Sequence, residues 1–429
     1  MVGTLIFVAS ALAGIHPVVP TPGHQDDLVM VKFVGDAART ADPRLLVDAA
    51  GLFDGGQLTR RAGGRLPGWW QIRTPDAPRL AAALAARPDV AHAYLAYAPA
   101  PPPADTTSDT PDFVGDQAWL TSLGFAETAL WPGGTGAEVV IGDVEYGWDP
   151  THEDLGATVG AAAGGWDSEY YTFHGNSVLG QLVGSDNGFG VVGAVPDAEI
   201  LVFSPYADNR SYDVAGAILD AVALLEAGDV LLIEQQAYVL DSYGPVEIDP
   251  GVWEAIALAV DAGITVVEPA GNGSLNLDDP DLEGWFDPTN DSGAILVGGG
   301  ASPLSGFSPR SWYPYGSCYG RRVDVQAWYD HVVTATGGEY GGYYADLYFP
   351  DDDPRRAYTA TFGGTSGASP MVTAVAAAFQ SVRIAAGEEP WDPRDLRAAM
   401  RSLGTPQAGD VSRAIGPLPD LRRLLRTTR

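Results

Sequence analysis

Short apolar runs in the first hundred residues predict a small α+β module. The runs Leu28 to Val34 and Trp69 to Arg73 have the aliphatic and aromatic content that favours strands. The alanine-rich stretch Ala77 to Ala86 favours a helix, and Ala91 to Tyr97 has the pattern of a last strand. We therefore expect a compact α+β module over residues 25–97.

From Asp112 onward, short apolar runs typical of buried strands alternate with helical patterns. We expect strands at residues 138–141, 200–203, 230–233, 264–267 and 295–297, and helices from 178, over 214–226 and 252–261, after Ser366, and over 393–400 and 418–425. This alternation predicts an α/β fold over residues 112–429, a doubly wound and mostly parallel sheet with helices on both faces. Ligand sites in such sheets lie at the carboxyl ends of the strands.

Composition marks the boundaries of these two parts. Residues 98–111 are rich in Pro, Thr, Ser and Asp, which is typical of an extended linker. The apolar start, residues 1–15, contains Ala11-Leu12-Ala13 ahead of Gly14 and has the character of a signal peptide without its basic n-region. Export to the cell envelope or the medium is therefore expected, and a truncated or mispredicted start is the alternative.

The charge of the chain is strongly acidic and unevenly distributed. The net charge is −31, with ten acids and nine bases before Asp112 and 45 acids and 15 bases from it onward. This balance argues against nucleic-acid binding, which needs a basic surface. It favours a highly soluble surface, with a preference for basic peptides as the sharper alternative. No run is long enough to span a membrane, and the single cysteine, Cys318, excludes an intrachain disulfide.

Three positions in the second part have the character of a nucleophile, a base and an acid. Ser366 lies between glycines and small residues where an apolar helix begins, so the helix N-terminus and the open backbone favour a nucleophile there. His174 lies before another helix among small residues and suits a general base. Asp143 follows the strand at Val139–Gly142, and Glu145 and Asp149 are rival acids nearby.

The chain order of these residues discriminates among hydrolase classes. An α/β-hydrolase needs its histidine after the serine, and no histidine follows His331. A zinc motif of the His-Glu-x-x-His type is also missing, because His152-Glu153 continues as Asp-Leu-Gly. The order acid, histidine, serine remains, which is the order of subtilisin.

Three segments in this order resemble the motifs of the subtilisin-like serine proteases, the subtilases. The resemblance covers residues 112–380 and rests on the histidine segment His174–Gly180, the asparagine segment Val266–Gly273 and the serine segment Gly364–Pro370. It implies that Ser366 attacks the peptide carbonyl, that His174 accepts and returns the proton, and that Asp143 orients the imidazole. It also implies that Asn272 and the backbone N–H of Ser366 stabilise the oxyanion, with no cofactor required for the chemistry.

Two segments depart from the family pattern. The family's aspartate is usually followed by Ser or Thr and then Gly, whereas Val144, Glu145 and Tyr146 follow Asp143 here. Glu234, Gln235 and Gln236 stand in place of the family's Ser-Leu-Gly substrate strand, where backbone pairing with a substrate could persist. Glu234 could then face the primary pocket and favour basic residues.

The resemblance extends to a structural calcium ion and to a propeptide. Ser185–Val191 is similar to a calcium loop of the family, with Asp154, Asp186 and Asn187 as expected oxygen ligands. The N-terminal module is similar to a propeptide, which implies a zymogen cleaved within the linker; a binding module that stays attached is the alternative. The resemblance as a whole implies a monomeric serine endopeptidase acting on proteins or peptides.

Two other functions stay open from the sequence. The altered acid and substrate-strand motifs suit a catalytically silent binding or scaffold protein with the same fold. A serine peptidase that uses Glu and Asp in place of histidine is the second alternative, and it would leave His174 without a role.

Overall fold

The computed structural model of the 429-residue chain describes residues 24–34, 57–60, 68–97, 109–155, 159–161, 171–206, 211–337 and 344–428. The chain divides into two compact units, Met1–Thr107 and Ser108–Arg429, and each is described by itself. The predicted signal peptide over residues 1–15 and most of the predicted linker, residues 98–108, lie outside the described residues.

The described residues of the first unit form a four-stranded antiparallel sheet with one helix on it. The strands β1 (His24–Phe33), β2 (Gln57–Arg60), β3 (Trp69–Arg73) and β4 (Val90–Tyr97) have the order β2-β3-β1-β4, and α2 is Ala77–Ala85. Alternate residues of β1, Val29, Val31 and Phe33, pack with Leu80 and Leu84 of α2 in one core. The elements predicted for this region are confirmed, and β2 is an addition.

The second unit is built on a seven-stranded parallel sheet, with the order β13-β12-β11-β8-β5-β7-β6. The bounds of these strands are β5 Val140–Val144, β6 Val159–Ala161, β7 Glu199–Phe203, β8 Val230–Ile233, β11 Thr265–Pro269, β12 Ile295–Gly300 and β13 Val325–Trp328. Two short antiparallel pairs accompany it, β9 (Gln236–Val239) with β10 (Ser242–Pro245) and β14 (Val332–Ala335) with β15 (Tyr358–Phe362).

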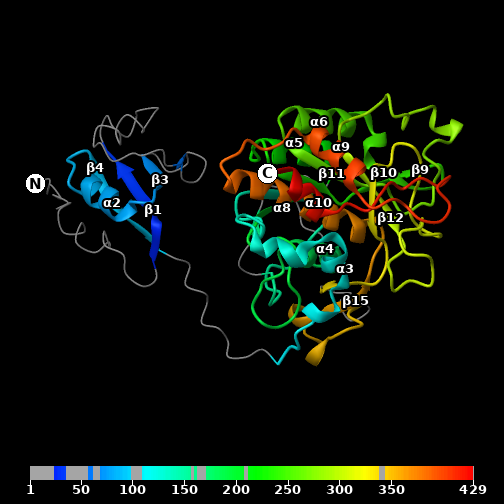
Figure 1. The fold of residues 1–429 in the computed structure, drawn as a ribbon, viewed down its shortest axis with the longest axis horizontal. Helices are drawn as coiled ribbons and strands as arrows, with labels where there is room; N and C mark the ends of the chain where they lie inside the picture. The colour runs from blue at the N-terminus through cyan, green and yellow to red at the C-terminus, as the bar shows by residue number, and fades with distance from the viewer. Residues whose placement is uncertain are drawn as a thin grey trace, which may run out of the picture. The chain divides into compact units, whose positions relative to one another are not determined.

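Helices cover both faces of this sheet (Figure 1). The helices α4 (Thr172–Val183) and α8 (Thr365–Ala385) pack on one face, together with Val139, Ile141, Val230 and Leu232. The helices α5 (Val214–Val222) and α6 (Pro250–Asp261) pack on the other, together with Val144, Leu231 and Ile233. The remaining helices are α3 (Ala118–Leu123), α9 (Pro393–Leu403) and α10 (Leu421–Leu425). The predicted doubly wound α/β fold is confirmed.

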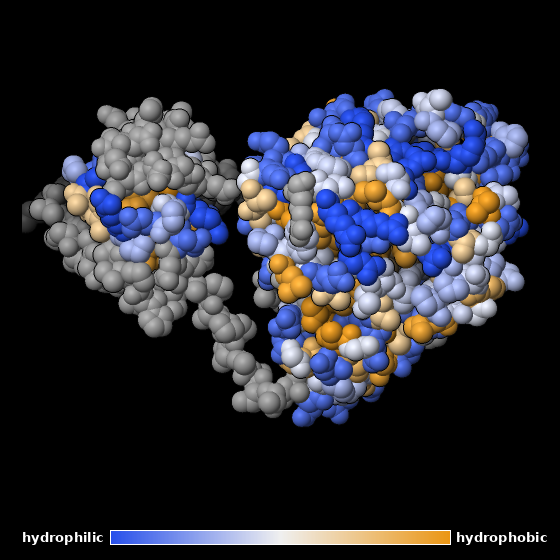
Figure 2. All heavy atoms as spheres, in the orientation of Figure 1, coloured by the Kyte–Doolittle hydropathy of each residue, from blue (hydrophilic) through white to orange (hydrophobic). Residues whose placement is uncertain are grey.

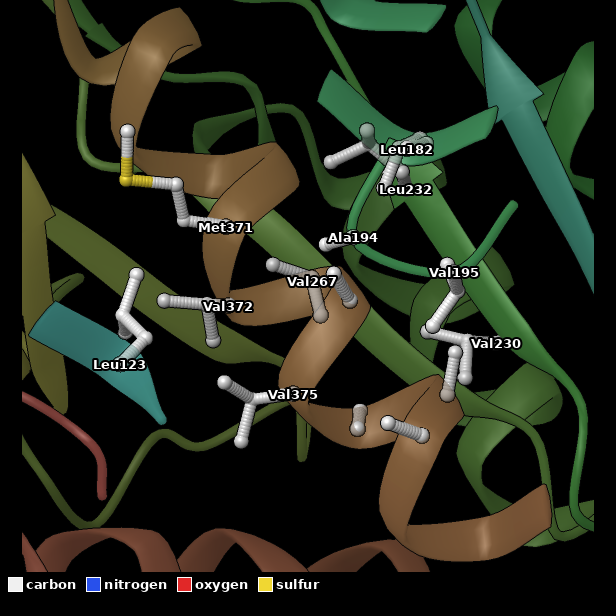
Figure 3. Packing of buried hydrophobic residues seen from close by; sticks show 14 of the residues in the cluster. Leu123, Leu182, Ala194, Val195, Val230, Leu232, Val267, Met371, Val372 and Val375 are labelled. Atoms are coloured by element: carbon white, nitrogen blue, oxygen red, sulfur yellow. The ribbon is translucent and has the colours of Figure 1, made fainter. Parts of the chain in front are cut away.

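Helix α8 is the centre of the core in the second unit. Its side chains from Gly367 to Val382 are buried, and nearly all of them are apolar or small. Figure 3 shows Met371, Val372 and Val375 of this helix among aliphatic side chains such as Leu123 and Val267. Its N-terminus is fixed by this packing, so a side chain on its first turn has a defined position.

The second unit begins earlier than predicted. Thr110 is buried, and its hydroxyl donates to Glu153 Oε1 at 2.6 Å. The carbonyl of Pro111 accepts a hydrogen bond of 2.8 Å from the N–H of Gly190. At the end of the predicted linker, Thr110 is therefore buried, whereas Pro111 is exposed and is hydrogen-bonded through its carbonyl.

The visible surface of the second unit is mostly hydrophilic, with apolar residues in separate small groups (Figure 2). Among the residues that the structure describes, no helix has the length and apolar character needed to cross a membrane.

Candidate active site

The alternation of side chains along β5 and β8 brings three acids to one face of the sheet. Odd positions of β5 and even positions of β8 face the layer of α4 and α8. Asp143 and Glu145 therefore face this layer, and so does Glu234, the first residue after β8. The two strands pair in parallel, with Val144 opposite Ile233, so Glu145 and Glu234 are neighbours at the carboxyl ends.

The acid that contacts the histidine is Glu145. Nδ1 of His174, in the first turn of α4, lies 2.8 Å from Oε2 of Glu145. The Glu145 side chain is fully buried and its other oxygen accepts the backbone N–H of Tyr146 at 2.7 Å. A carboxylate on Nδ1 fixes the tautomer in which Nε2 can accept a proton.

Asp143 does not occupy the position that we predicted. Strand β5 continues to Val144, so Asp143 lies inside the strand rather than at its end. Both oxygens of its carboxyl group are buried without a hydrogen-bond partner in the structure. Burial, and then the charge of Glu145, raise the pKa of Asp143 well above its ordinary value, which favours the neutral acid. The predicted contact of Asp143 with the imidazole is therefore replaced by that of Glu145, one alternation step further along the chain.

Ser366 lies in the first turn of α8, where backbone N–H groups have no partner within the helix. The turn is preceded by Gly364 with φ +83°, a conformation that favours glycine. The side-chain oxygen of Asn272 accepts hydrogen bonds from the backbone N–H and the hydroxyl of Thr365, at 2.8 and 3.1 Å. The amide Nδ2 of Asn272, which donates one hydrogen to Gln236, lies beside the start of the helix.

A cavity of about 780 Å³ joins these residues. His174, Asn272 and Ser366 line it together with the three residues predicted to bind substrate, Glu234, Gln235 and Gln236. The structure thus brings together every predicted catalytic and substrate residue except Asp143.

The substrate-strand residues have defined contacts in this cavity. Oε1 of Gln236 accepts from the backbone N–H of Asn272 at 3.1 Å and from its Nδ2 at 3.4 Å. Gln235 accepts from the Tyr212 hydroxyl at 2.8 Å and donates to the carbonyl of Val144 at 3.1 Å. Glu234 is buried, and burial followed by the charges of Glu145 and Asp143 raises its pKa well above the ordinary range. A neutral Glu234 does not supply the charge that would attract a basic side chain.

Two of the three residues predicted to bind calcium, Asp154 and Asn187, contact each other. Asp154 is buried, and its oxygens accept from Asn187 Nδ2 at 2.8 Å, the N–H of Val191 at 2.8 Å and the hydroxyl of Tyr358 at 2.9 Å. Desolvation raises the pKa of Asp154 to about 7. Asp186 is exposed, and the described residues contain no cluster of three acidic, histidine or cysteine side chains that could hold a metal. The carboxylate of Asp154 thus accepts hydrogen bonds from three protein donors.

The alternation identifies Glu145 as the acid of the site only when the strand is known to extend past Gly142. Asp143 and Glu145 share a face, and the acid nearer the carboxyl end of a parallel strand lies nearer the site. The strand extends beyond the run Val139–Gly142. Its last two residues, Asp143 and Val144, therefore resemble a loop in the sequence.

Residues 136–414 match the Subtilase family, which is well over half of the chain. The chain belongs to the subtilase family.

Proteins that are similar to this chain in sequence include named proteases. The chain is 27% identical to fervidolysin of Fervidobacterium pennivorans over 311 residues, covering 68% of this chain and 41% of fervidolysin. It is 26% identical to an intracellular serine protease of Paenibacillus polymyxa, covering 63% of this chain and 76% of that protein. The chain thus spans about two fifths of the length of fervidolysin.

Solved structures share the fold. The crystal structure of fervidolysin, described as a keratinolytic enzyme related to subtilisin, matches with a TM-score of 0.53 at 17% identity, covering 95% of this chain and 62% of that one. A protease from Pseudoalteromonas arctica matches with a TM-score of 0.54 at 17% identity, covering 75% of this chain and all of that one. These matches confirm the subtilisin-like architecture.

Proposed function

We propose that this protein is a serine endopeptidase whose catalytic triad is Glu145, His174 and Ser366. The observation that carries the proposal is the hydrogen bond between Glu145 and Nδ1 of His174, in a cavity that His174 shares with Ser366. The family membership and the protease relatives support the same chemistry.

In the proposed reaction, the hydroxyl of Ser366 attacks the peptide carbonyl while Nε2 of His174 takes its proton. Glu145 stabilises the imidazolium, which then returns the proton to the leaving amine. Nδ2 of Asn272 and the backbone N–H of Ser366 donate to the oxyanion of the tetrahedral intermediate. Water then hydrolyses the acyl-enzyme by the same route.

Labelling with a fluorophosphonate probe tests this function. We expect the wild-type chain to be labelled, Ser366→Ala and His174→Ala to lose the label, and Ser402→Ala, a control on exposed α9, to keep it. An unlabelled wild type that also fails to cleave casein would favour the silent binding protein. Labelling and hydrolysis that survive His174→Ala would favour the carboxyl-type peptidase.

We further propose that the protein is an exported zymogen and that the first unit is its propeptide. The apolar start supports export, and the separate antiparallel sheet with its own core supports a removable module. Thr110 and Pro111 are hydrogen-bonded within the second unit, so we place the cleavage before them. N-terminal sequencing of the purified wild type should give a terminus between residues 98 and 110, and Ser366→Ala should keep the longer chain. Equal termini in both would contradict self-maturation.

The cavity favours peptides with cationic side chains. Aromatic rings line it, including Tyr146, Tyr171, Tyr206, Tyr212, Tyr238 and Tyr243, and the acids Asp213 and Asp249 lie beside them. Neither lysine nor arginine is among the lining residues. Tyrosine faces and carboxylates both attract cations. In profiling with matched peptides, we expect sequences that contain Arg or Lys to be cleaved faster than sequences that contain Glu. The difference in rate should shrink at high salt. Faster cleavage of the Glu-containing peptides would contradict the preference for cationic side chains.

A further inference from the structure

Glu234 is a buried acid inside the candidate active site that the proposed reaction does not use. It follows β8 directly, only 2% of its surface is exposed, and it lines the cavity together with Ser366 and His174. Neither of its carboxyl oxygens has a hydrogen-bond partner of standard geometry in the structure. A buried polar group without a partner is costly, so one that points into a functional cavity calls for a role.

The surroundings of Glu234 decide its charge. Two acids from β5 and its end, Asp143 and Glu145, face Glu234. The nearby imidazole of His174 is already hydrogen-bonded to Glu145. Its own strand is followed by the neutral Gln235 and Gln236, and the loop after β11 contributes the neutral Asn272. The ionisable side chains that line the same cavity are tyrosines, Asp213 and Asp249 besides His174, so no full positive charge from lysine or arginine balances it there. Three acids in one buried place cannot all be ionised at neutral pH.

The Ser366 hydroxyl, in the first turn of α8, lines the same cavity as the Glu234 carboxyl. Its interaction with this carboxyl lowers the pKa of Glu234, with a smaller effect than burial and the two acids have. A neutral carboxyl group can donate its O–H to the serine oxygen and leave the serine proton free for the imidazole. An ionised carboxylate could only accept that serine proton, and so would compete with His174.

We propose that Glu234 is a positioning residue of the reaction centre, a neutral carboxylic acid that holds the Ser366 hydroxyl toward His174. This inference rests on the proposed function, because it assigns a second partner to the same nucleophile. It adds no covalent step. It predicts that ionisation of Glu234 at alkaline pH removes activity, which a purely structural acid would not do.

The test compares Glu234→Gln with Glu234→Ala in the full chain, with hydrolysis and fluorophosphonate labelling measured from pH 5 to 10. The glutamine amide keeps a neutral donor, so its kcat should stay within about threefold of wild type near neutrality. The alanine variant should lose about tenfold or more in kcat, with little change in KM. The alkaline decline of the wild type should be absent or shifted upward in Glu234→Gln. Exposed Glu199→Gln is the matched control, and thermal melting of each variant reports folding.

The outcomes separate this inference from the proposed function. A wild type that is labelled, with an alanine variant as fast as wild type, contradicts the role of Glu234 alone. A Glu234→Gln variant with the pH profile of the wild type would also contradict this role. So would a Glu234→Gln variant that loses as much activity as a variant of the triad. A wild type that neither reacts with the probe nor cleaves peptides contradicts both.

Discussion

At the scale of residues, two neighbouring acids have different surroundings. Glu145 accepts hydrogen bonds from the imidazole of His174 and from the backbone N–H of Tyr146. Asp143 is buried with no donor, and its raised pKa favours the neutral form. Glu145 is thus the acid in contact with the imidazole, and Asp143 lies behind it without a donor.

The side-chain amide of Asn272 is held in a defined orientation beside the start of α8. Thr365 donates two hydrogen bonds to its oxygen, and its Nδ2 donates to Oε1 of Gln236 at 3.4 Å. We expect Asn272→Ala to lower kcat by about 10²–10³-fold. Asn272→Asp keeps the acceptor for Thr365 but loses the donor, so it should lose activity while melting close to wild type. Steady-state hydrolysis checks both, and an unchanged kcat in either would remove Asn272 from the reaction.

How much of the site the sequence could predict depends on the residue. His174, Asn272 and Ser366 stand in motifs of small residues, and all three line the cavity as expected. The acid that contacts His174 could not be identified in the same way. The residue at which β5 ends depends on its pairing with β7 and β8, and the local sequence pattern does not show this pairing. The neutral state of Glu234 depends on Asp143 and Glu145, which come from another strand.

At the scale of elements, the first turn of α4 lies directly on the segment after β5. A Cβ atom added to Gly175 would clash with the carbonyl oxygen of Gly147 and lie 2.9 Å from Cγ of Glu145. Real Cβ atoms are not found at such distances from a backbone atom, so only glycine allows the approach. The glycine next to His174 thereby fixes the distance between the histidine and its acid.

We therefore expect Gly175→Ala to displace the helix from the strand. The clash should cost about 1–3 kcal/mol of unfolding free energy. Activity should fall about tenfold or more, because small displacements of catalytic groups are costly. Urea unfolding and steady-state hydrolysis measure the two effects. Gly115→Ala is the control, since nothing lies within 4 Å of its Cβ position; equal behaviour of the two variants would contradict the argument.

The elements that the sequence predicted best are the ones buried on both faces. β8 was predicted to the residue, and β7, β11 and β12 to within three, because continuous aliphatic runs mark central parallel strands. The start of α4 was placed six residues late, because its first turn carries the polar site residue His174. The strands β6, β13, β14 and β15 were not predicted, since runs of three to five residues give little periodicity.

At the scale of the whole molecule, several buried acids have raised pKa values. Burial raises the pKa of Asp154 to about 7 and that of Asp229 to about 6, and it raises those of Asp143, Glu234 and Glu268 as well. Each of these groups stabilises the fold most below its unfolded pKa, near 4, and this contribution is lost as pH rises through the folded value. Burial lowers the pKa of His152, so that residue favours the fold above about 6.5 and opposes it in acid.

Stability should therefore be highest in mild acid and decline through pH 6–8. We expect the melting temperature to be higher near pH 5.5 than near pH 8.5 by about 5 °C or more at constant ionic strength. Asp143→Asn should reduce this difference, because it removes one of the buried acids. The exposed control Asp186→Asn should leave it unchanged. Calorimetry across this range would contradict the account if stability rose steadily to pH 8.5.

We propose that Glu145, and not Asp143, completes the triad with His174 and Ser366. A direct test is kcat/KM for one peptide substrate with Glu145→Gln and Asp143→Asn, two substitutions that each replace a buried carboxyl by an amide. We expect a loss of about 10⁴-fold for Glu145→Gln, because the imidazolium loses its counter-charge. We expect a change of less than about threefold for Asp143→Asn, which replaces one neutral group by another. A large loss in Asp143→Asn with near-normal activity in Glu145→Gln would contradict the assignment of Glu145.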